Sequence, residues 1–172
     1  MLAQELALDL DRKLRHPNLM LKLDMEKAYN RVEWSFLIFM LRQFGFQERT
    51  VILLFRTVSN NWFSVLINGS PSECFRVTWG VRQGDPLSSA LFLLMSEYLR
   101  RGLQHLFDQK ESCYFVSTGS RVSYLAFADD ILVLARCSEN CLDSLVTFFT
   151  CYQAASGQRI NEGKSSFILS NR

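Results

Sequence analysis

The sequence contains little of several features that mark particular classes of protein. Its 2 histidines and 5 cysteines include no CxxC pair, so we expect neither a zinc site nor a disulfide framework. We interpret the cysteines as small buried hydrophobic residues in a reducing compartment. No charge-free apolar stretch approaches the roughly 20 residues that a membrane span needs, and acidic residues interrupt the apolar N-terminus, unlike in a secretory signal. These absences predict an intracellular, soluble protein without a membrane partner.

A strong excess of either charge is also missing. The chain has 19 Lys and Arg against 17 Asp and Glu, for a formal net charge of +2. Proteins that bind nucleic acid usually carry a dense basic face, so this charge neither supports nor excludes such a partner. The 172 residues, of which 48% are hydrophobic, are enough to bury a core and suit one domain, or most of one, over residues 1–172.

Periodicity and turn residues predict alternating helices and strands along the chain. The expected elements are a helix over residues 2–14 with leucine at every fourth position, a strand over 19–24, helices over 28–43 and 47–59, a hairpin turn at Asn68-Gly69, a helix from Pro86 to about Phe107, strands over 121–127 and 131–136, a helix over 139–156, and a loop plus strand over 158–170. This order favours an antiparallel sheet with helices packed on one face, an α+β fold.

Two adjacent carboxylates interrupt an apolar stretch, YLAFADDILVLAR, at residues 124–136. Asp129 and Asp130 are expected at a hairpin tip, and on their own they are more typical of a solvated turn. Asp24, however, ends a second predicted strand, and a sheet that places this strand beside the hairpin brings three carboxylates together. A divalent cation would relieve their repulsion, and carboxylate oxygens suit Mg²⁺. Two such ions about 3.5 to 4 Å apart support in-line phosphoryl displacement.

Four segments resemble, in this order, the palm motifs of reverse transcriptases. They are LKLDMEKAYNRV at 21–32, VRQGDPLSSALFLL at 81–94, YLAFADDILVLA at 124–135 and SGQRINEGKSSF at 156–167. The likeness is strongest to the non-LTR, LINE-type retrotransposon enzymes, particularly as they occur in plant genomes. It implies a reverse-transcriptase-type palm and an RNA-directed DNA polymerase whose partners are an RNA template, a DNA primer and deoxynucleoside triphosphates.

The resemblance also implies roles for four catalytic residues. Asp24 and Asp129 correspond to the ligands of two Mg²⁺ ions, for which Mn²⁺ is a possible substitute, and Asp130 corresponds to the second aspartate of the hairpin. The ions would activate a primer 3′-hydroxyl, which attacks the α-phosphate of the nucleotide and expels pyrophosphate. Lys164 matches a lysine that donates a proton to the departing pyrophosphate; the alternative is a solvated surface lysine.

Five further residues are implied to contact the nucleotide. Tyr29 matches an aromatic gate whose ring stands under the sugar and excludes a 2′-hydroxyl; the alternative is an ordinary core aromatic residue. Gln83 lies near the sugar and the template, and Gly84 lets the backbone approach the nucleotide. Arg82 is either a phosphate contact or a surface charge. Met25 begins a run of backbone amides that reaches the triphosphate.

The chain departs from the family pattern in several respects. Asn30 stands where the family commonly has Asp, and Ser89 stands where it commonly has Pro. Reverse transcriptases also have an upstream fingers region and a downstream thumb, and we expect both to be largely missing here, with other chains as candidate sources. We therefore predict a palm fragment. The alternatives are a catalytically silent retrotransposon remnant and a fragment of a group II intron-type reverse transcriptase.

Overall fold

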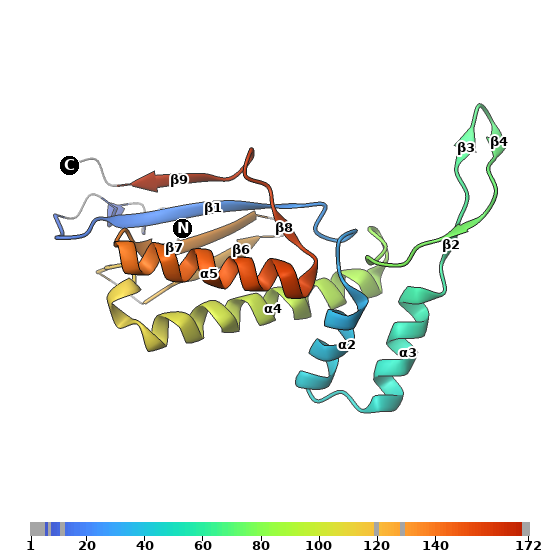
Figure 1. Cartoon of the computed structure of the whole chain (residues 1–172), viewed down its shortest axis with the longest axis horizontal. Helices are drawn as coiled ribbons and strands as arrows, with labels where there is room; N and C mark the ends of the chain where they lie inside the picture. The colour runs from blue at the N-terminus through green and yellow to red at the C-terminus, as the bar shows by residue number, and fades with distance from the viewer. Residues whose placement is uncertain (1–5, 7, 11–12, 119–120, 128–129, 170–172) are drawn as a thin grey trace.

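The centre of the molecule is an antiparallel sheet (Figure 1). The computed structural model describes residues 6, 8–10, 13–118, 121–127 and 130–169. The sheet has the strand order β6-β7-β1-β8, and β9 also pairs with β1. Its strands are β1 (Asn18–Glu26), β6 (Tyr124–Phe127), β7 (Asp130–Arg136), β8 (Arg159–Ile160) and β9 (Ser166–Leu169). Strands β8 and β9 pair with different parts of β1, at Met25–Glu26 and Leu19–Lys22 respectively.

Two long helices, α4 (Pro86–Gln109) and α5 (Glu139–Ser156), cover one face of this sheet (Figure 1). Alternate residues of β1 and β7 point toward them, because successive side chains of a strand lie on opposite faces. The resulting core includes Leu23, Met25, Ile131, Val133, Met95, Leu99, Leu103, Phe107, Leu145 and Phe149. The predicted α+β class, with an antiparallel sheet and helices on one face, is confirmed.

The opposite face of the sheet changes character along β1. At one end Met20 and Leu134 join a second apolar cluster with Leu6, Leu10 and Phe115. At the other end the same face carries charged and partly exposed residues instead. The cluster thus covers only part of this face and leaves a polar region at the C-terminal end of β1.

Two shorter helices and two small strand pairs complete the fold. Helices α2 (Trp34–Gln43) and α3 (Glu48–Ser59) precede a strand pair, β2 (Trp62–Phe63) with β5 (Phe75–Arg76), and a hairpin, β3 (Leu66–Ile67) with β4 (Ser70–Pro71); a 3-10 turn, η1, spans Glu111–Cys113. The hairpin extends away from the sheet (Figure 1). Asn68 and Gly69 have φ of 51° and 83°, which fits the left-handed turn predicted at this dipeptide.

The second predicted helix starts later than its sequence indicates. Residues 27–31 form a turn, in which the amides of Asn30 and Arg31 donate to the Lys27 carbonyl at 2.9 and 3.2 Å, and α2 begins only at Trp34. Lys27, the residue before the predicted helix, has φ of 49°, which lies in the left-handed region. The Glu33 amide donates to the Ser156 carbonyl at 2.9 Å, so a tertiary hydrogen bond replaces a helical one.

Two other expectations need correction. The N-terminal helix does not extend to Leu14, because residues 9 and 10 lie in a turn and residues 13 and 14 are irregular; residues 1–5, 7 and 11–12 lie outside the described residues. Of the cysteines, Cys113 and Cys141 are buried as predicted, whereas Cys74 and Cys151 are exposed. Burial raises the pKa of the Cys141 thiol to about 12, so this sulfur stays protonated at neutral pH. In the described part of the chain, no helix is long and apolar enough to cross a membrane.

Candidate active site

The polar end of the sheet brings together two of the three predicted carboxylates. Asp24 in β1 pairs with Asp130, the first residue of β7, in the antiparallel register. Directly opposed residues share one face of the sheet, with Cβ atoms about 4.5–5.5 Å apart. This face is the one that α4 and α5 do not cover, since Leu23 and Met25 point into the helical core. The third carboxylate, Asp129, lies outside the described residues.

A lysine neutralises one of these carboxylates. The Nζ of Lys22 lies 3.2 Å from Oδ1 of Asp130, and both side chains are more than half exposed, at 53% and 57%. Lys22 lies two residues before Asp24 in β1, on the same face. An ion pair this exposed contributes about 0–1 kcal/mol. A cation that binds Asp130 more strongly would therefore displace the Lys22 ammonium group at little cost in stability.

The backbone of Asp24 is fixed by the segment between β8 and β9. The Asp24 amide donates to Oγ of Ser165 at 3.1 Å, and the Asn161 amide donates to the Asp24 carbonyl at 2.9 Å. Lys164 lies in the intervening turn, with its amide 3.2 Å from the Asn161 carbonyl and its side chain exposed. The turn that carries Lys164 is thus held beside Asp24, although the two residues are far apart in the sequence.

The second sequence motif is attached to the turn that follows β1. The amides of Gly80 and Val81 donate to the carbonyls of Val32 and Tyr29, both at 2.8 Å, and the indole Nε1 of Trp34 donates to the Gly80 carbonyl at 2.8 Å. A Cβ on Gly80 would lie 2.6 Å from the Asn30 carbonyl oxygen. Only glycine permits this close backbone contact.

This attachment fixes the start of the loop that contains three predicted nucleotide contacts. Arg82, Gln83 and Gly84 are exposed. Gly84 has φ of 92°, and a Cβ there would meet no atom within 4 Å. The next residue, Asp85, caps α4 by accepting from the Leu87 amide at 2.8 Å. The loop therefore runs over the surface between two fixed points, with its backbone open to a ligand.

The Tyr29 side chain is partly accessible, whereas the Met25 side chain is buried. The Tyr29 ring is half-buried and stacks on Phe92 with centroids 4.5 Å apart and planes 17° apart. It therefore packs on the core and remains partly accessible, which is compatible with either predicted role. Met25 has a buried side chain, 5% exposed, and its backbone pairs with Ile160 of β8. The Met25 side chain therefore packs in the core, and the predicted run of backbone amides leaves the sheet at Lys27.

The chemistry of the carboxylates fits a divalent cation. Within the described ranges, no group of three or more His, Cys, Asp or Glu side chains is arranged to hold a metal. Asp24 and Asp130 alone supply two opposed oxygen donors, with Asp130 open to solvent. Mg²⁺ is commonly held by one or two carboxylates and keeps several waters. The described pair thus matches the donor set of a partly hydrated Mg²⁺.

Three residues that contact Asp24 or Asp130 are not among the predicted site residues: Lys22 through its ammonium group, Ser165 through its hydroxyl and Asn161 through its backbone amide. Lys22 has a signal, because strand alternation places it on the face of Asp24. Ser165 is 141 positions from Asp24, and nothing local in the sequence indicates that contact. Its identification requires the pairing of β8 and β9 with β1.

Both the sequence and the fold of this chain have known relatives. Residues 3–172 match the family model described as "Reverse transcriptase (RNA-dependent DNA polymerase)". The chain belongs to the reverse transcriptase family. The four motifs that carry the predicted resemblance lie within the matched residues, so the predicted family is confirmed.

Curated relatives of this reverse transcriptase chain include retrotransposon proteins. It is 34% identical over 153 residues to "Transposon TX1 uncharacterized 149 kDa protein" of Xenopus laevis, covering 87% of this chain and 11% of that protein. It is 28% identical over 147 residues to the R2 "Retrovirus-related Pol polyprotein" of Popillia japonica, covering 85% of this chain and 23% of that protein. These matches support the non-LTR part of the prediction. Neither organism is a plant, so they do not support the predicted plant origin.

Solved structures similar to this reverse transcriptase chain include telomerases. Telomerase from Candida albicans, in complex with a TWJ fragment of telomeric RNA, gives a TM-score of 0.68 at 16% identity, covering 97% of this chain and 31% of that chain. Apo telomerase from Candida tropicalis gives 0.66 at 16% identity, covering 98% of this chain and 32% of that chain. This likeness concerns the fold, and it confirms the predicted reverse-transcriptase-type palm.

Proposed function

We propose that this chain is the palm portion of an RNA-directed DNA polymerase of non-LTR, LINE-type retrotransposon origin. In this proposal Asp24, Asp129 and Asp130 hold two Mg²⁺ ions and direct nucleotidyl transfer to a primer 3′-hydroxyl. The observation that supports it best is the pairing of Asp24 with Asp130 on the face of the sheet opposite α4 and α5. Because the chain spans less than a quarter of the TX1 and R2 proteins, fingers and thumb are proposed to come from other segments or chains.

The residues of the chain would act mainly by positioning. When bound, the two ions would lower the pKa of the primer hydroxyl and neutralise charge on the transferred phosphate. Hydrogen bonds from Asn161 and to Ser165 fix the backbone of Asp24, while Lys22 holds Asp130 in the absence of metal. Lys164, on the turn beside Asp24, is the proposed proton donor to pyrophosphate.

The proposed partners are an RNA template, a DNA primer and deoxynucleoside triphosphates. Gln83 and Gly84 lie on an exposed loop whose start is bonded to the turn after β1. A nucleotide at Asp24 and Asp130 would therefore have this loop as one wall. Arg82, exposed on the same loop, is the proposed contact to a template or nucleotide phosphate, where its guanidinium suits bidentate binding.

Replacing Tyr29 by Ala is expected to lower the preference for deoxynucleotides over ribonucleotides by at least tenfold. The aromatic ring is the proposed steric barrier to a 2′-hydroxyl, and a steric contact of this kind contributes roughly 1–3 kcal/mol of discrimination. The ratio of kcat/KM for dATP and ATP measures the effect. Tyr29→Phe is the control, because it keeps the ring stacked on Phe92. Unchanged selectivity in a folded Tyr29→Ala variant would leave the ring with a packing role only.

The proposed function is tested by primer extension. The purified chain is incubated at high concentration with a primed RNA template, deoxynucleotides and Mg²⁺, with Asp129→Asn as the inactive comparison. We expect extension that requires Mg²⁺ or Mn²⁺ and is absent from the variant. The same metals should raise the thermal unfolding midpoint of the wild-type chain, because a ligand that binds only the native state stabilises it. A folded chain with neither response would be a silent remnant.

A further inference from the structure

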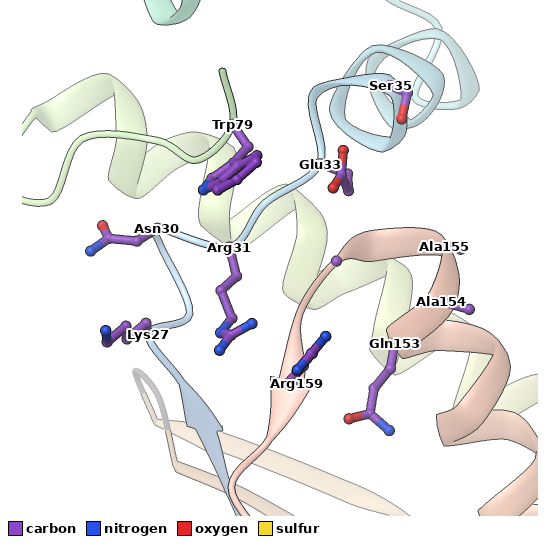
Figure 2. Close-up of a pocket in the computed structure, with 11 residues that line it drawn as sticks. Lys27, Asn30, Arg31, Glu33, Ser35, Trp79, Gln153, Ala154, Ala155 and Arg159 are labelled. Carbon is purple, nitrogen blue, oxygen red and sulfur yellow. The ribbon is translucent and has the colours of Figure 1, made fainter. Parts of the chain in front are cut away.

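A basic pocket lies beyond Asp24, at the end of β1. It has a volume of about 800 Å³ and is formed by the turn after β1, the C-terminal end of α5 and the start of β8 (Figure 2). Its lining includes three cationic side chains, Lys27, Arg31 and Arg159, and one acidic side chain, Glu33. The pocket therefore has a net positive lining in a chain whose overall charge is almost balanced.

The position of Arg159 relates this pocket to the candidate active site. Arg159 pairs with Glu26 in the β1–β8 register, and Glu26 lies on the same face as Asp24, two residues further along the strand. Two residues of a β-strand span roughly 7 Å. Nη2 of Arg31 lies 3.0 Å from Oε2 of Glu26. The two arginines thus lie next to Glu26, whose backbone is roughly 7 Å from that of Asp24.

Arg31 has hydrogen-bonding capacity that the chain does not use. Among the residues that the structure describes, its Nε is buried and has no hydrogen-bond partner. A buried donor without a partner is unfavourable. Figure 2 shows the Arg31 guanidinium extending into the pocket between Lys27 and Arg159. A guanidinium presents a planar set of donors that matches phosphate oxygens.

The backbone beneath Arg31 is firmly held. A Cβ on Gly157 would lie 2.5 Å from the Arg31 carbonyl oxygen, so the end of α5 packs directly on this turn. The Glu33 amide also donates to the Ser156 carbonyl at 2.9 Å. The Arg31 backbone is therefore held in place before any ligand arrives, and the ion pair with Glu26 restrains its side chain, which reduces the entropy lost on binding.

We propose that Lys27, Arg31 and Arg159 form a binding site for inorganic pyrophosphate. The site has three cations, two of them guanidinium groups; among the described residues, Glu33 is the acidic side chain of its lining, and Glu26 is paired with Arg31. Such a group of cations suits a small ligand that carries several negative charges better than it suits a ligand with a single carboxylate. The inference rests on the proposed function, because pyrophosphate is the product released beside Asp24. The pocket would receive the product after it leaves the metal ions.

The first test measures binding without metal. Isothermal titration of the whole chain with pyrophosphate, in buffer with EDTA, should give a dissociation constant at least tenfold higher for Arg159→Gln than for wild type. Arg49→Gln removes the same charge from an exposed position on α3 and should bind as wild type does. Equal thermal unfolding midpoints would show that both variants fold. No measurable binding by wild type, or equal losses in both variants, would overturn the proposal.

The second test separates pyrophosphate from other phosphate sources. In primer extension, Arg159→Gln should raise the inhibition constant of added pyrophosphate by about tenfold, and much more than it raises the KM for the deoxynucleotide. A dominant rise in KM would assign the pocket to the triphosphate of the substrate, and a dominant loss of primer–template affinity would assign it to nucleic acid. Either result would overturn the pyrophosphate site.

The two tests also separate this proposal from the proposed function. Metal-free binding does not require extension, so a chain that never extends a primer can still lose pyrophosphate affinity in Arg159→Gln. That result would support the pyrophosphate site and contradict the proposed polymerase activity. Extension with unchanged pyrophosphate binding and inhibition in Arg159→Gln would retain the polymerase and reject the pocket.

Discussion

Replacing Asp24 by Asn is expected to lower primer extension by about 1,000-fold or more. Asparagine keeps the shape of the side chain but removes the charge that would hold the metal ions. A metal ion typically contributes several kcal/mol of charge stabilisation in the transition state, and each 1.36 kcal/mol corresponds to a factor of ten in rate. Rates of nucleotide addition at saturating Mg²⁺ and deoxynucleotide measure the loss.

The same substitution should have the opposite effect on stability without metal. Asp24 faces Asp130 across the sheet, and like charges placed directly opposite each other are destabilising, by roughly 0.2–1 kcal/mol. Because the ion pair with Lys22 offsets part of this repulsion, Asp24→Asn should raise the free energy of unfolding in EDTA by less than about 1 kcal/mol. It should also remove the stabilisation by Mg²⁺ that the wild-type chain shows.

The matched control for this prediction is Asp143→Asn, an exposed aspartate on α5. It makes the same chemical change away from the polar end of the sheet, so extension and Mg²⁺ response should both remain at the wild-type level. Asp24→Asn with extension within threefold of wild type would contradict the role of Asp24 as a metal ligand. So would an undiminished Mg²⁺ response.

The elements that the sequence predicts well are those determined by local chemistry. Alternating apolar residues mark β1, and its residues pair along β7 as a strand should. Asn68-Gly69 forms the expected turn because both residues tolerate positive φ. Pro86 begins α4, where a missing amide hydrogen removes no helical bond. Each of these signals lies within a few residues of the feature that it predicts.

The parts that the sequence does not predict depend on distant contacts. The helix expected from residue 28 begins only at Trp34, because the Glu33 amide bonds to the end of α5 instead. The sequence places Asp24 at a strand end and Asp130 at a hairpin, but only the register puts them opposite each other. The basic pocket brings together Arg31 and Arg159, which are separated by most of the sequence. Such pairings are set by tertiary packing, which overrides local preference.

Replacing Gly80 by Ala is expected to lower the free energy of unfolding by about 3–5 kcal/mol, a large part of the roughly 5–15 kcal/mol that typical domains have. Gly80 is buried and has φ of 84°, and its new Cβ would lie 2.6 Å from the Asn30 carbonyl oxygen and 3.0 Å from the Asn30 carbonyl carbon. Because these are backbone atoms, one segment must move. That movement would weaken the hydrogen bonds from Gly80 and Val81, each contributing about 1 kcal/mol.

Gly69→Ala separates the cost of the left-handed backbone from the cost of the contact with Asn30. Gly69 has nearly the same φ, 83°, but a Cβ there would meet nothing within 4 Å, so only the left-handed backbone is penalised, by about 1–2 kcal/mol. Urea denaturation of both variants gives the difference, and equal losses would mean that the contact with Asn30 is unimportant. Since Gly80 also fixes the start of the loop that carries Gln83 and Gly84, its replacement should reduce extension even where the variant is fully folded. Gly69→Ala, on the distant hairpin, should extend primers as wild type does.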